Sequence, residues 1–188
     1  MFIGNNEKVN NSIKNNIFYG IIFISLLGFF LHFVYDLSGK LLIIGIIAPI
    51  NESVWEHLKL AFFPTILWWT ISYFLLKRKN KISFCRYFVS SVVSLVVCPL
   101  FIISFYYTYT GAFGFHSTIL DIASLPIGAT IAQLIALHIY QYAKLKLYHL
   151  YLATLILFIL IIAFILFTFN PPHLPIFIDS RTGKYGLN

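Results

Sequence analysis

The chain has 188 residues, of which 60% are hydrophobic and only 10% are charged. Soluble domains carry about 25% charged residues, so this composition excludes an ordinary soluble domain. The 13 lysines and arginines outnumber the 6 acidic residues, but they lie in short clusters beside apolar runs, as orientation signals do in membrane proteins. The balance therefore indicates an integral membrane protein whose partner is the lipid bilayer, and it gives no support to nucleic-acid binding.

Five apolar runs approach or exceed the roughly 18 residues that a transmembrane helix needs. They cover residues 17–35, 58–76, 88–107, 119–140 and 147–169. The segment Leu41–Ile50 is too short to cross a bilayer and predicts a re-entrant or interfacial helix. The fold class is therefore an all-α polytopic transmembrane bundle with five spans plus this short helix, or six elements if the segment crosses.

The basic residues predict the orientation of the bundle. They flank the second and third spans, separate the fourth from the fifth, and precede the first: Lys8, Lys14, Lys77, Arg78, Lys79, Lys81, Arg86, Lys144 and Lys146. With five spans, all these positions fall on one side of the membrane. We therefore predict one integral membrane domain over residues 1–188, with a polar cytoplasmic N-terminus (1–16) and a polar, extended, extracytoplasmic tail (170–188).

Acidic and histidine side chains gather at the predicted outer ends of the spans. They occur in three stretches, HFVYD at 32–36, NESVWEH at 51–57 and FHSTILD at 115–121. Ionisable groups at such depths usually face the protein interior and mark a site. We therefore expect these stretches to meet around one polar site.

Imidazole nitrogens and carboxylate oxygens, with no thiolate, are ligands that suit Zn²⁺, Mn²⁺, Fe²⁺ or Ni²⁺. The candidate metal ligands are His32, Asp36, His57, His116 and Asp121. Glu52 and Glu56 are the candidate catalytic carboxylates, with Glu52 as the general base for a metal-bound water and Glu56, like Asp121, orienting the ligands. The sequence contains no H-E-x-x-H motif, so the spacing alone does not define a known metalloenzyme.

A purely structural interpretation competes with this one. Ser53 to Glu56 reads S-x-x-E, a capping box in which Glu56 would return to the Ser53 amide, and Thr118 to Asp121 reads as a second cap. Capping accounts for Glu56 and Asp121 but gives no reason for His57. Lys59 is expected at the membrane interface with its ammonium group in water, in preference to a pair with Glu56.

Three longer stretches, HFVYD, PINESVWEHLK and PPHLPIFIDSRTGKYG, together resemble an uncharacterised family of small bacterial polytopic membrane proteins, a domain of unknown function. The resemblance covers nearly the whole chain. It implies a bacterial cytoplasmic (inner) membrane location and brings no activity or catalytic residue with it.

The leading functional hypothesis is a membrane-embedded, metal-dependent hydrolase or transferase acting on a lipid or lipid-linked substrate, because the acids and histidines lie at headgroup depth. One alternative is a transporter or binding protein for a cation or small solute, in which the same carboxylates hold the cargo or a proton. Another is a non-catalytic membrane partner, such as an immunity or assembly factor. Metal analysis of the purified protein separates the first hypothesis from the others.

Overall fold

The computed structural model describes the backbone of residues 2–79 and 82–187, and the side chains of 11–78 and 82–187. This part of the chain forms seven α-helices and one short 3₁₀ helix and contains no strand. The elements are α1 (Phe2–Leu37), α2 (Leu42–Gly45), α3 (Val54–His57), α4 (Lys59–Lys79), α5 (Phe84–Phe113), α6 (Thr118–Tyr142), α7 (Leu147–Phe169) and η1 (Pro175–Phe177).

Five helical stretches of the described chain are long and apolar enough to cross a membrane. They are Asn11–Leu37, Val54–Arg78, Phe84–Phe113, Thr118–Tyr142 and Leu147–Phe169. The predicted all-α bundle with five spans is therefore confirmed. Helix α1 begins well inside the stretch predicted as a polar N-terminus, because backbone hydrogen bonds can extend a helix beyond the apolar run that anchors it.

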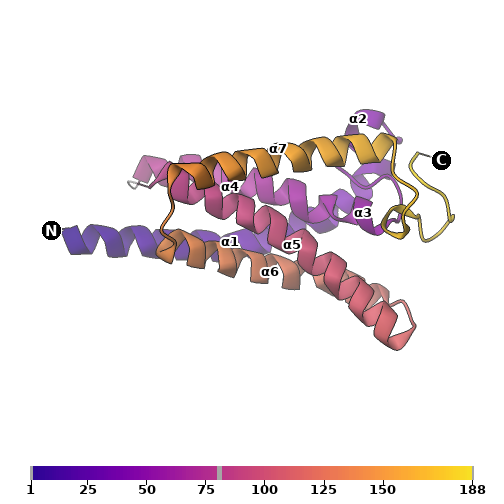
Figure 1. Cartoon of the computed structure of the whole chain (residues 1–188), viewed down its shortest axis with the longest axis horizontal. Coiled ribbons are helices and arrows are strands. Elements are labelled where there is room, and N and C mark those ends of the chain that lie inside the picture. The colour runs from indigo at the N-terminus through magenta and orange to yellow at the C-terminus, as the bar shows by residue number, and fades with distance from the viewer. Residues whose placement is uncertain (1, 80–81, 188) are drawn as a thin grey trace.

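The short segment between the first two spans does not cross the bundle. Helix α2 has only four residues, about 6 Å of helix against a hydrocarbon core of roughly 30 Å. The chain turns into it through Gly39 and Lys40, both with positive φ. Figure 1 shows α2, α3 and the C-terminal tail together at one end of the molecule, which we call the tail end.

Most neighbouring long helices are antiparallel, but α5 and α7 run in the same direction. Helix α5 pairs with α6 along much of its length, α1 packs on α4 and α6, and α7 packs on α5. Helices α1 and α4 approach closely at Gly28, where an added Cβ atom would lie 2.5 Å from the Leu60 carbonyl oxygen. A small residue is needed there because it lets two backbones come together.

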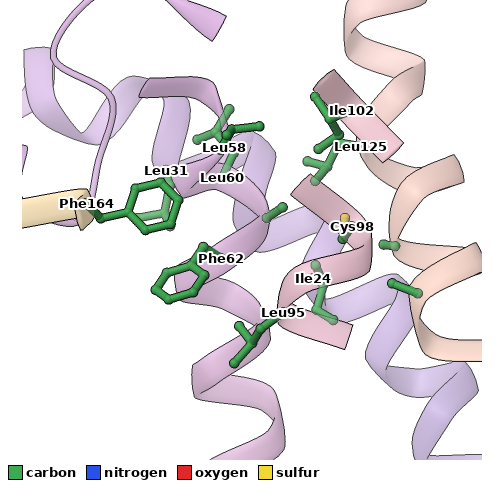
Figure 2. Packing of buried hydrophobic residues seen from close by; sticks show 13 residues of the cluster. Ile24, Leu31, Leu58, Leu60, Phe62, Leu95, Cys98, Ile102, Leu125 and Phe164 are labelled. Carbon is green, nitrogen blue, oxygen red and sulfur yellow. The ribbon is translucent and has the colours of Figure 1, made fainter. Parts of the chain in front are cut away.

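Buried side chains form two main apolar clusters inside the bundle. The tail-side cluster, shown in Figure 2, joins α1, α4, α5, α6 and α7 through residues that include Leu31, Phe62, Cys98, Leu125 and Phe164. The N-side cluster lies toward the other end and contains Ile13, Ile17, Trp69, Tyr87, Ala136 and Tyr140. Helix α7 contributes little to either, since only 11% of its apolar window is buried, and its remaining surface suits contact with lipid.

Candidate metal centre at the tail end

Two hydrogen bonds cap the N-terminus of α3. The Glu56 N–H donates to Ser53 Oγ at 3.3 Å, so Ser53 is the N-cap that the sequence predicts. The Ser53 N–H, however, donates to Asn51 Oδ1 at 3.0 Å. The prediction that Glu56 closes a capping box is therefore wrong, and Asn51 performs that half of the cap.

The Glu56 carboxylate is instead buried in a pair with Lys59. Lys59 Nζ lies 2.6 Å from Glu56 Oε2 and also donates to the Gly45 carbonyl at 2.7 Å. The Ile50 N–H and the Thr168 hydroxyl donate to the two carboxylate oxygens at 3.0 and 3.4 Å. The Lys59 side chain is 0% exposed, so the prediction of an interfacial lysine is wrong. The ammonium group is stable without water because the carboxylate and a carbonyl are both within reach.

Three of the predicted site residues converge beside this pair. His32 comes from α1, Glu52 from the loop before α3, and His57 from the last position of α3. One potential ligand atom from each of the three lies within 4.8 Å of the other two. The Nε2 atom of His57 is 3.3 Å from Glu52 Oε2, and the His32 and His57 rings lie 5.2 Å apart between centroids. We call these three residues the His/Glu/His cluster.

The hydrogen bonds of His57 determine which ring nitrogen faces the cluster. Its Nδ1 atom lies 2.8 Å from the Ser53 carbonyl oxygen, and because a carbonyl only accepts, Nδ1 carries the proton. In the neutral ring, Nε2 then presents a lone pair toward the Glu52 carboxylate. This repulsive arrangement is relieved either by a second proton on the ring or by a cation held between the two groups.

His32 supplies a second imidazole without a competing partner at one nitrogen. Its Nδ1 atom is buried and makes no hydrogen bond within the described chain. A buried polar atom of this kind is unfavourable unless something bonds to it. Both histidine side chains of the cluster and the Glu52 side chain are only partly buried, so the cluster is reachable from the tail end.

The C-terminal tail folds back over this region, and the prediction of an extended tail is therefore wrong. Phe177 of η1 packs on Trp55 of α3 with ring centroids 5.0 Å apart. The Asn51 side-chain amide donates to the Gly186 carbonyl at 3.0 Å, and the Ser180 hydroxyl donates to the Glu52 carbonyl at 3.2 Å. The tail thus lies against the same loop that carries Glu52.

A tight turn in the tail presents Arg181 to the cluster. Asp179 organises the turn, because its carboxylate accepts from the Arg181 N–H at 3.0 Å and from the Thr182 hydroxyl at 2.6 Å. These bonds lower the pKa of Asp179 although its burial acts in the opposite direction. Arg181 Nη2 then lies 3.0 Å from Glu52 Oε1, with the Arg181 side chain 74% exposed.

Glu52 consequently has one carboxylate oxygen for each of two partners. Its Oε2 faces His57 and its Oε1 faces Arg181. The hydrogen bond that the protonated His57 ring donates, followed by the charge of Arg181, holds the pKa of Glu52 below its usual value of 4.5 against the opposing effect of burial. Glu52 is therefore ionised at neutral pH and available to a cation.

The other predicted site residues lie outside the cluster. Glu56 is engaged with Lys59, and Asp36 is exposed at the end of α1. His116 Nδ1 is 3.2 Å from the Tyr106 hydroxyl, and Asp121 accepts from the Tyr109 hydroxyl at 2.6 Å. In Figure 1 the turn between α5 and α6, which contains His116, diverges from the tail.

The second predicted cap is displaced by one residue. Ser117, in place of Thr118, is the N-cap of α6, because its hydroxyl accepts from the Leu120 N–H at 3.4 Å. Asp121 still lies in the first turn of the helix, where a carboxylate interacts favourably with the helix dipole. Capping and the Tyr109 bond together account for Asp121 without a metal.

Sequence reasoning missed Arg181 as a site residue. The stretch Asp179–Lys184 shows turn-forming residues, and Asp followed by Ser and Thr predicts a side-chain-stabilised turn. That pattern indicates local shape but does not say which distant residue the turn will contact. The pairing with Glu52 depends on a contact between residues 129 positions apart, which the turn pattern does not encode.

The fold and site together define a five-span α-helical membrane protein with a histidine and carboxylate cluster at one end of its bundle. The model of the "Family of unknown function (DUF6512)" matches residues 5–187, and the chain belongs to that family. The resemblance to an uncharacterised family is confirmed in this respect. No curated protein and no solved structure matches the chain significantly.

Proposed function

We propose that this protein binds a divalent transition metal through His32, Glu52 and His57. We further propose that it uses the metal as a membrane-embedded hydrolase or transferase acting on a lipid or lipid-linked substrate. The observation that carries the proposal is the convergence of the three side chains from separate elements, with their ligand atoms within 4.8 Å of one another. Two histidines and one carboxylate form a ligand set that catalytic zinc sites use.

The spacing within the cluster suits tetrahedral coordination. A zinc ion with ligand bonds of about 2.0–2.2 Å places its ligands about 3.3–3.6 Å apart. The 3.3 Å separation of His57 Nε2 from Glu52 Oε2 already has this value. Small side-chain rotations of His32 would complete the set, because all three ligand atoms are within 4.8 Å of one another.

The neighbours of the ligands have the roles that supporting groups have in metal sites. Metal-ligating histidines usually donate their other ring N–H to a carbonyl or carboxylate, which fixes the ring. His57 does so through Nδ1 to the Ser53 carbonyl. Arg181 orients the Glu52 carboxylate from its other oxygen. In this proposal Glu52 is a metal ligand and not the general base that the sequence suggested.

The arrangement also supports the proposed reaction class. Three protein ligands leave a coordination position for water, and a bound metal lowers the pKa of that water toward neutrality. The exposed carboxylate of Asp36, one helical turn from His32, is the group that would accept its proton. In hydrolysis the water oxygen bonds to the carbonyl carbon or phosphorus, the bond to the leaving oxygen breaks, and the proton passes to that oxygen.

Location suggests an amphiphilic substrate with an anionic group. The cluster lies at one end of the spanning helices. With the orientation that the positive-inside rule predicts, this end would face the outside of the cell at the depth of lipid headgroups. The exposed guanidinium of Arg181, next to the cluster, offers paired N–H donors that suit phosphate or carboxylate. Apolar chains of the same substrate would remain in the surrounding bilayer.

Metal content of the purified protein tests the proposal. We expect the parent to carry or take up one Zn²⁺ or Mn²⁺ per chain, measured by elemental analysis after dialysis against limiting metal. Added metal should also raise the thermal unfolding temperature, because a ligand that binds only the folded state stabilises it. Glu52→Gln and His57→Ala should abolish both effects.

His116→Ala is the matched control, since His116 lies outside the cluster although the sequence placed it among the ligands. It should bind metal like the parent. Absence of metal from the parent, with no thermal shift on addition, would contradict the proposal. The cluster would then be an ion-paired chain of His57, Glu52 and Arg181 that fastens the tail, an arrangement consistent with the transport or docking functions.

A further inference from the structure

A second group of polar side chains lies deep in the bundle, away from the tail end. Gln133 of α6 is 0% exposed, and neither atom of its side-chain amide has a hydrogen-bond partner within the described chain. The hydroxyl oxygens of Ser90 and Ser94 on α5 are also without partners, and these residues are 0% and 1% exposed. The indole N–H of Trp69 on α4 is buried and unpaired as well.

Contacts between the helices place these groups at neighbouring levels. On α6 and α5, Gly128 lies against Cys98, and the Tyr140 ring lies 6.4 Å from the Tyr87 ring. Because the two helices run antiparallel, Gln133 falls level with Ser94. One turn closer to the N-side cluster on α5 is Ser90.

Helix α4 meets α5 at the same levels. The Trp69 ring lies 4.8 Å from the Tyr87 ring, and the Ser72 and Tyr87 hydroxyls are hydrogen-bonded to each other. Because α4 and α5 run antiparallel, Trp69, three residues before Ser72, lies level with Ser90, three residues after Tyr87. The unpaired groups of three helices therefore form one layer, which we call the central polar layer: Trp69, Ser90, Ser94 and Gln133.

Apolar side chains close the central polar layer on both sides along the bundle axis. Toward the tail end lie Phe62, Leu95, Cys98 and Ala129 of the tail-side cluster. Toward the other end lie Ile17, Tyr87, Ala136 and Tyr140 of the N-side cluster, to which the Trp69 ring also belongs. The layer is also near the middle of α6, so in a membrane it lies far from both aqueous phases.

The unpaired serines are unusual for this chain. Serine and threonine in a helix commonly bond to the carbonyl four residues earlier, and Ser25, Thr65, Thr130, Thr154 and Thr168 do so here. Ser90 and Ser94 do not, although the same carbonyls are available to them. Their hydroxyls are therefore free for a ligand other than their own helix.

Leaving these groups unpaired would be strongly unfavourable. A buried polar group without a partner destabilises a protein, and a hydrocarbon surround offers no substitute for the missing bond. A small uncharged molecule that both donates and accepts would satisfy the amide, the hydroxyls and the indole together. Water has this chemistry, and buried water typically makes about three such bonds to protein.

We propose that the central polar layer is an internal hydration site, in which Gln133, Ser90, Ser94 and Trp69 bind ordered water in the middle of the membrane. The site is separate from the His/Glu/His cluster and does not depend on metal binding there. It gives the bundle an enclosed wet centre between two apolar clusters.

Glutamine side-chain labelling provides a direct test because the chain contains only two glutamines, Gln133 and Gln141. The full-length protein, labelled with ¹⁵N at the glutamine side-chain amides and reconstituted in phosphatidylcholine bilayers, should give two NH₂ signals in solid-state NMR. Magnetisation transferred from water should reach both signals at short mixing times. Gln141 is partly exposed near the end of α6 and serves as the internal wet reference.

Gln133→Leu assigns the signals, and Gln141→Leu assigns them by elimination if the first variant does not fold. The double variant Ser90→Ala/Ser94→Ala should reduce the water transfer to Gln133 several-fold and leave that to Gln141 unchanged. If Gln141 receives magnetisation from water and Gln133 receives none, the layer is dry and the proposal is overturned. Transfer to Gln133 that the serine double variant leaves unchanged would overturn the assignment of Ser90 and Ser94 as water ligands.

Discussion

Two buried polar regions of this bundle solve the same physical problem in different ways. At the tail end, Glu56 and Lys59 are almost fully buried, and together they bond to each other, to two backbone groups and to Thr168. In the central polar layer, Gln133 is as deeply buried but has no partner within the described chain. The charged pair is satisfied by protein and the neutral amide is not.

The difference follows from the backbone donors and acceptors that are available in each region. Charged groups tolerate burial only with close, well-aligned partners. The last residue of α2 supplies a free carbonyl and the loop before α3 supplies a free N–H, because neither group is used within a helix. The central layer is surrounded by long helices in which most backbone groups are bonded to one another, although Pro99 of α5 has no N–H for the Leu95 carbonyl. In our proposal, water completes the bonding there.

The largest effect is expected from breaking the tail-end pair. Lys59→Met leaves the Glu56 carboxylate buried without its cation, which should lower the free energy of unfolding by about 3–5 kcal/mol. Denaturant unfolding in detergent micelles measures this change. Glu56→Gln/Lys59→Met should recover part of the loss because no uncompensated charge remains.

Lys144→Met provides the control, since Lys144 is exposed between α6 and α7. It should change stability by less than about 0.5 kcal/mol. If Lys59→Met were as stable as the parent, the buried pair of Glu56 and Lys59 would contribute no more to stability than an exposed lysine does.

The next largest effect is expected at the tail-side cluster, which separates the two polar regions. Gly28 lies where α1 meets α4 beside the tail-side cluster, and an added methyl group would meet the Leu60 carbonyl oxygen at 2.5 Å and Leu125 Cδ2 at 2.7 Å. Gly28→Ala should therefore destabilise the protein by about 1–3 kcal/mol through overpacking. Thermal unfolding measures the effect.

Gly111→Ala is matched to this change because Gly111 is also helical but has no neighbouring atom within 4 Å of the added Cβ. It should be neutral or slightly stabilising, since alanine favours helix more than glycine. Equal effects of the two substitutions would show that the helices are not in close contact at Gly28.

A smaller effect is expected at the cap of α3, which holds the loop that completes the tail-end pair. Ser53→Ala removes the acceptor for the Glu56 N–H and should lower the free energy of unfolding by about 1 kcal/mol. Ser83 precedes α5 without a side-chain cap bond, so Ser83→Ala should have no measurable effect. A loss for Ser83→Ala equal to that for Ser53→Ala would argue against a capping role.

The smallest effect concerns acid stability. The pKa of Glu52 is held below 4.5 in the folded protein, so its contribution is complete above about pH 4.5 and is lost as the pH falls through the folded value. Glu52→Gln should therefore lower stability slightly at pH 6 and flatten its decline below pH 4.5. Unfolding temperatures between pH 3 and 6 measure this difference. If the variant lost stability with falling pH as steeply as the parent, the Glu52 contacts would be excluded as the origin of the acid sensitivity.

The fold could be predicted largely from the sequence because each span is a long apolar run bounded by polar residues. The short segment between the first two spans was also predicted as a separate element on length alone. Helix ends were less predictable: α1 and α5 extend beyond their apolar runs, since helical hydrogen bonding does not require apolar side chains.

The site was only partly predictable. Three of the seven candidate residues, His32, Glu52 and His57, come together because α3 lies at the same end of the bundle as the C-terminal end of α1. His116 and Asp121 were predicted at the same membrane depth as the cluster, but the sequence contains no signal that the α5–α6 turn diverges from the tail. Lys59 was predicted at the membrane interface but is buried, because its ammonium group pairs with Glu56, three residues earlier, inside the protein.

The turn that carries Arg181 also has a consequence for biosynthesis. Ribosomes make the chain from its N-terminus, so His32, Glu52 and His57 are all present long before residues 179–181 emerge. During that interval Glu52 has His57 beside it but lacks its guanidinium partner. The contacts of Glu52 at this end of the protein are therefore completed only when a turn made 129 residues later docks against it.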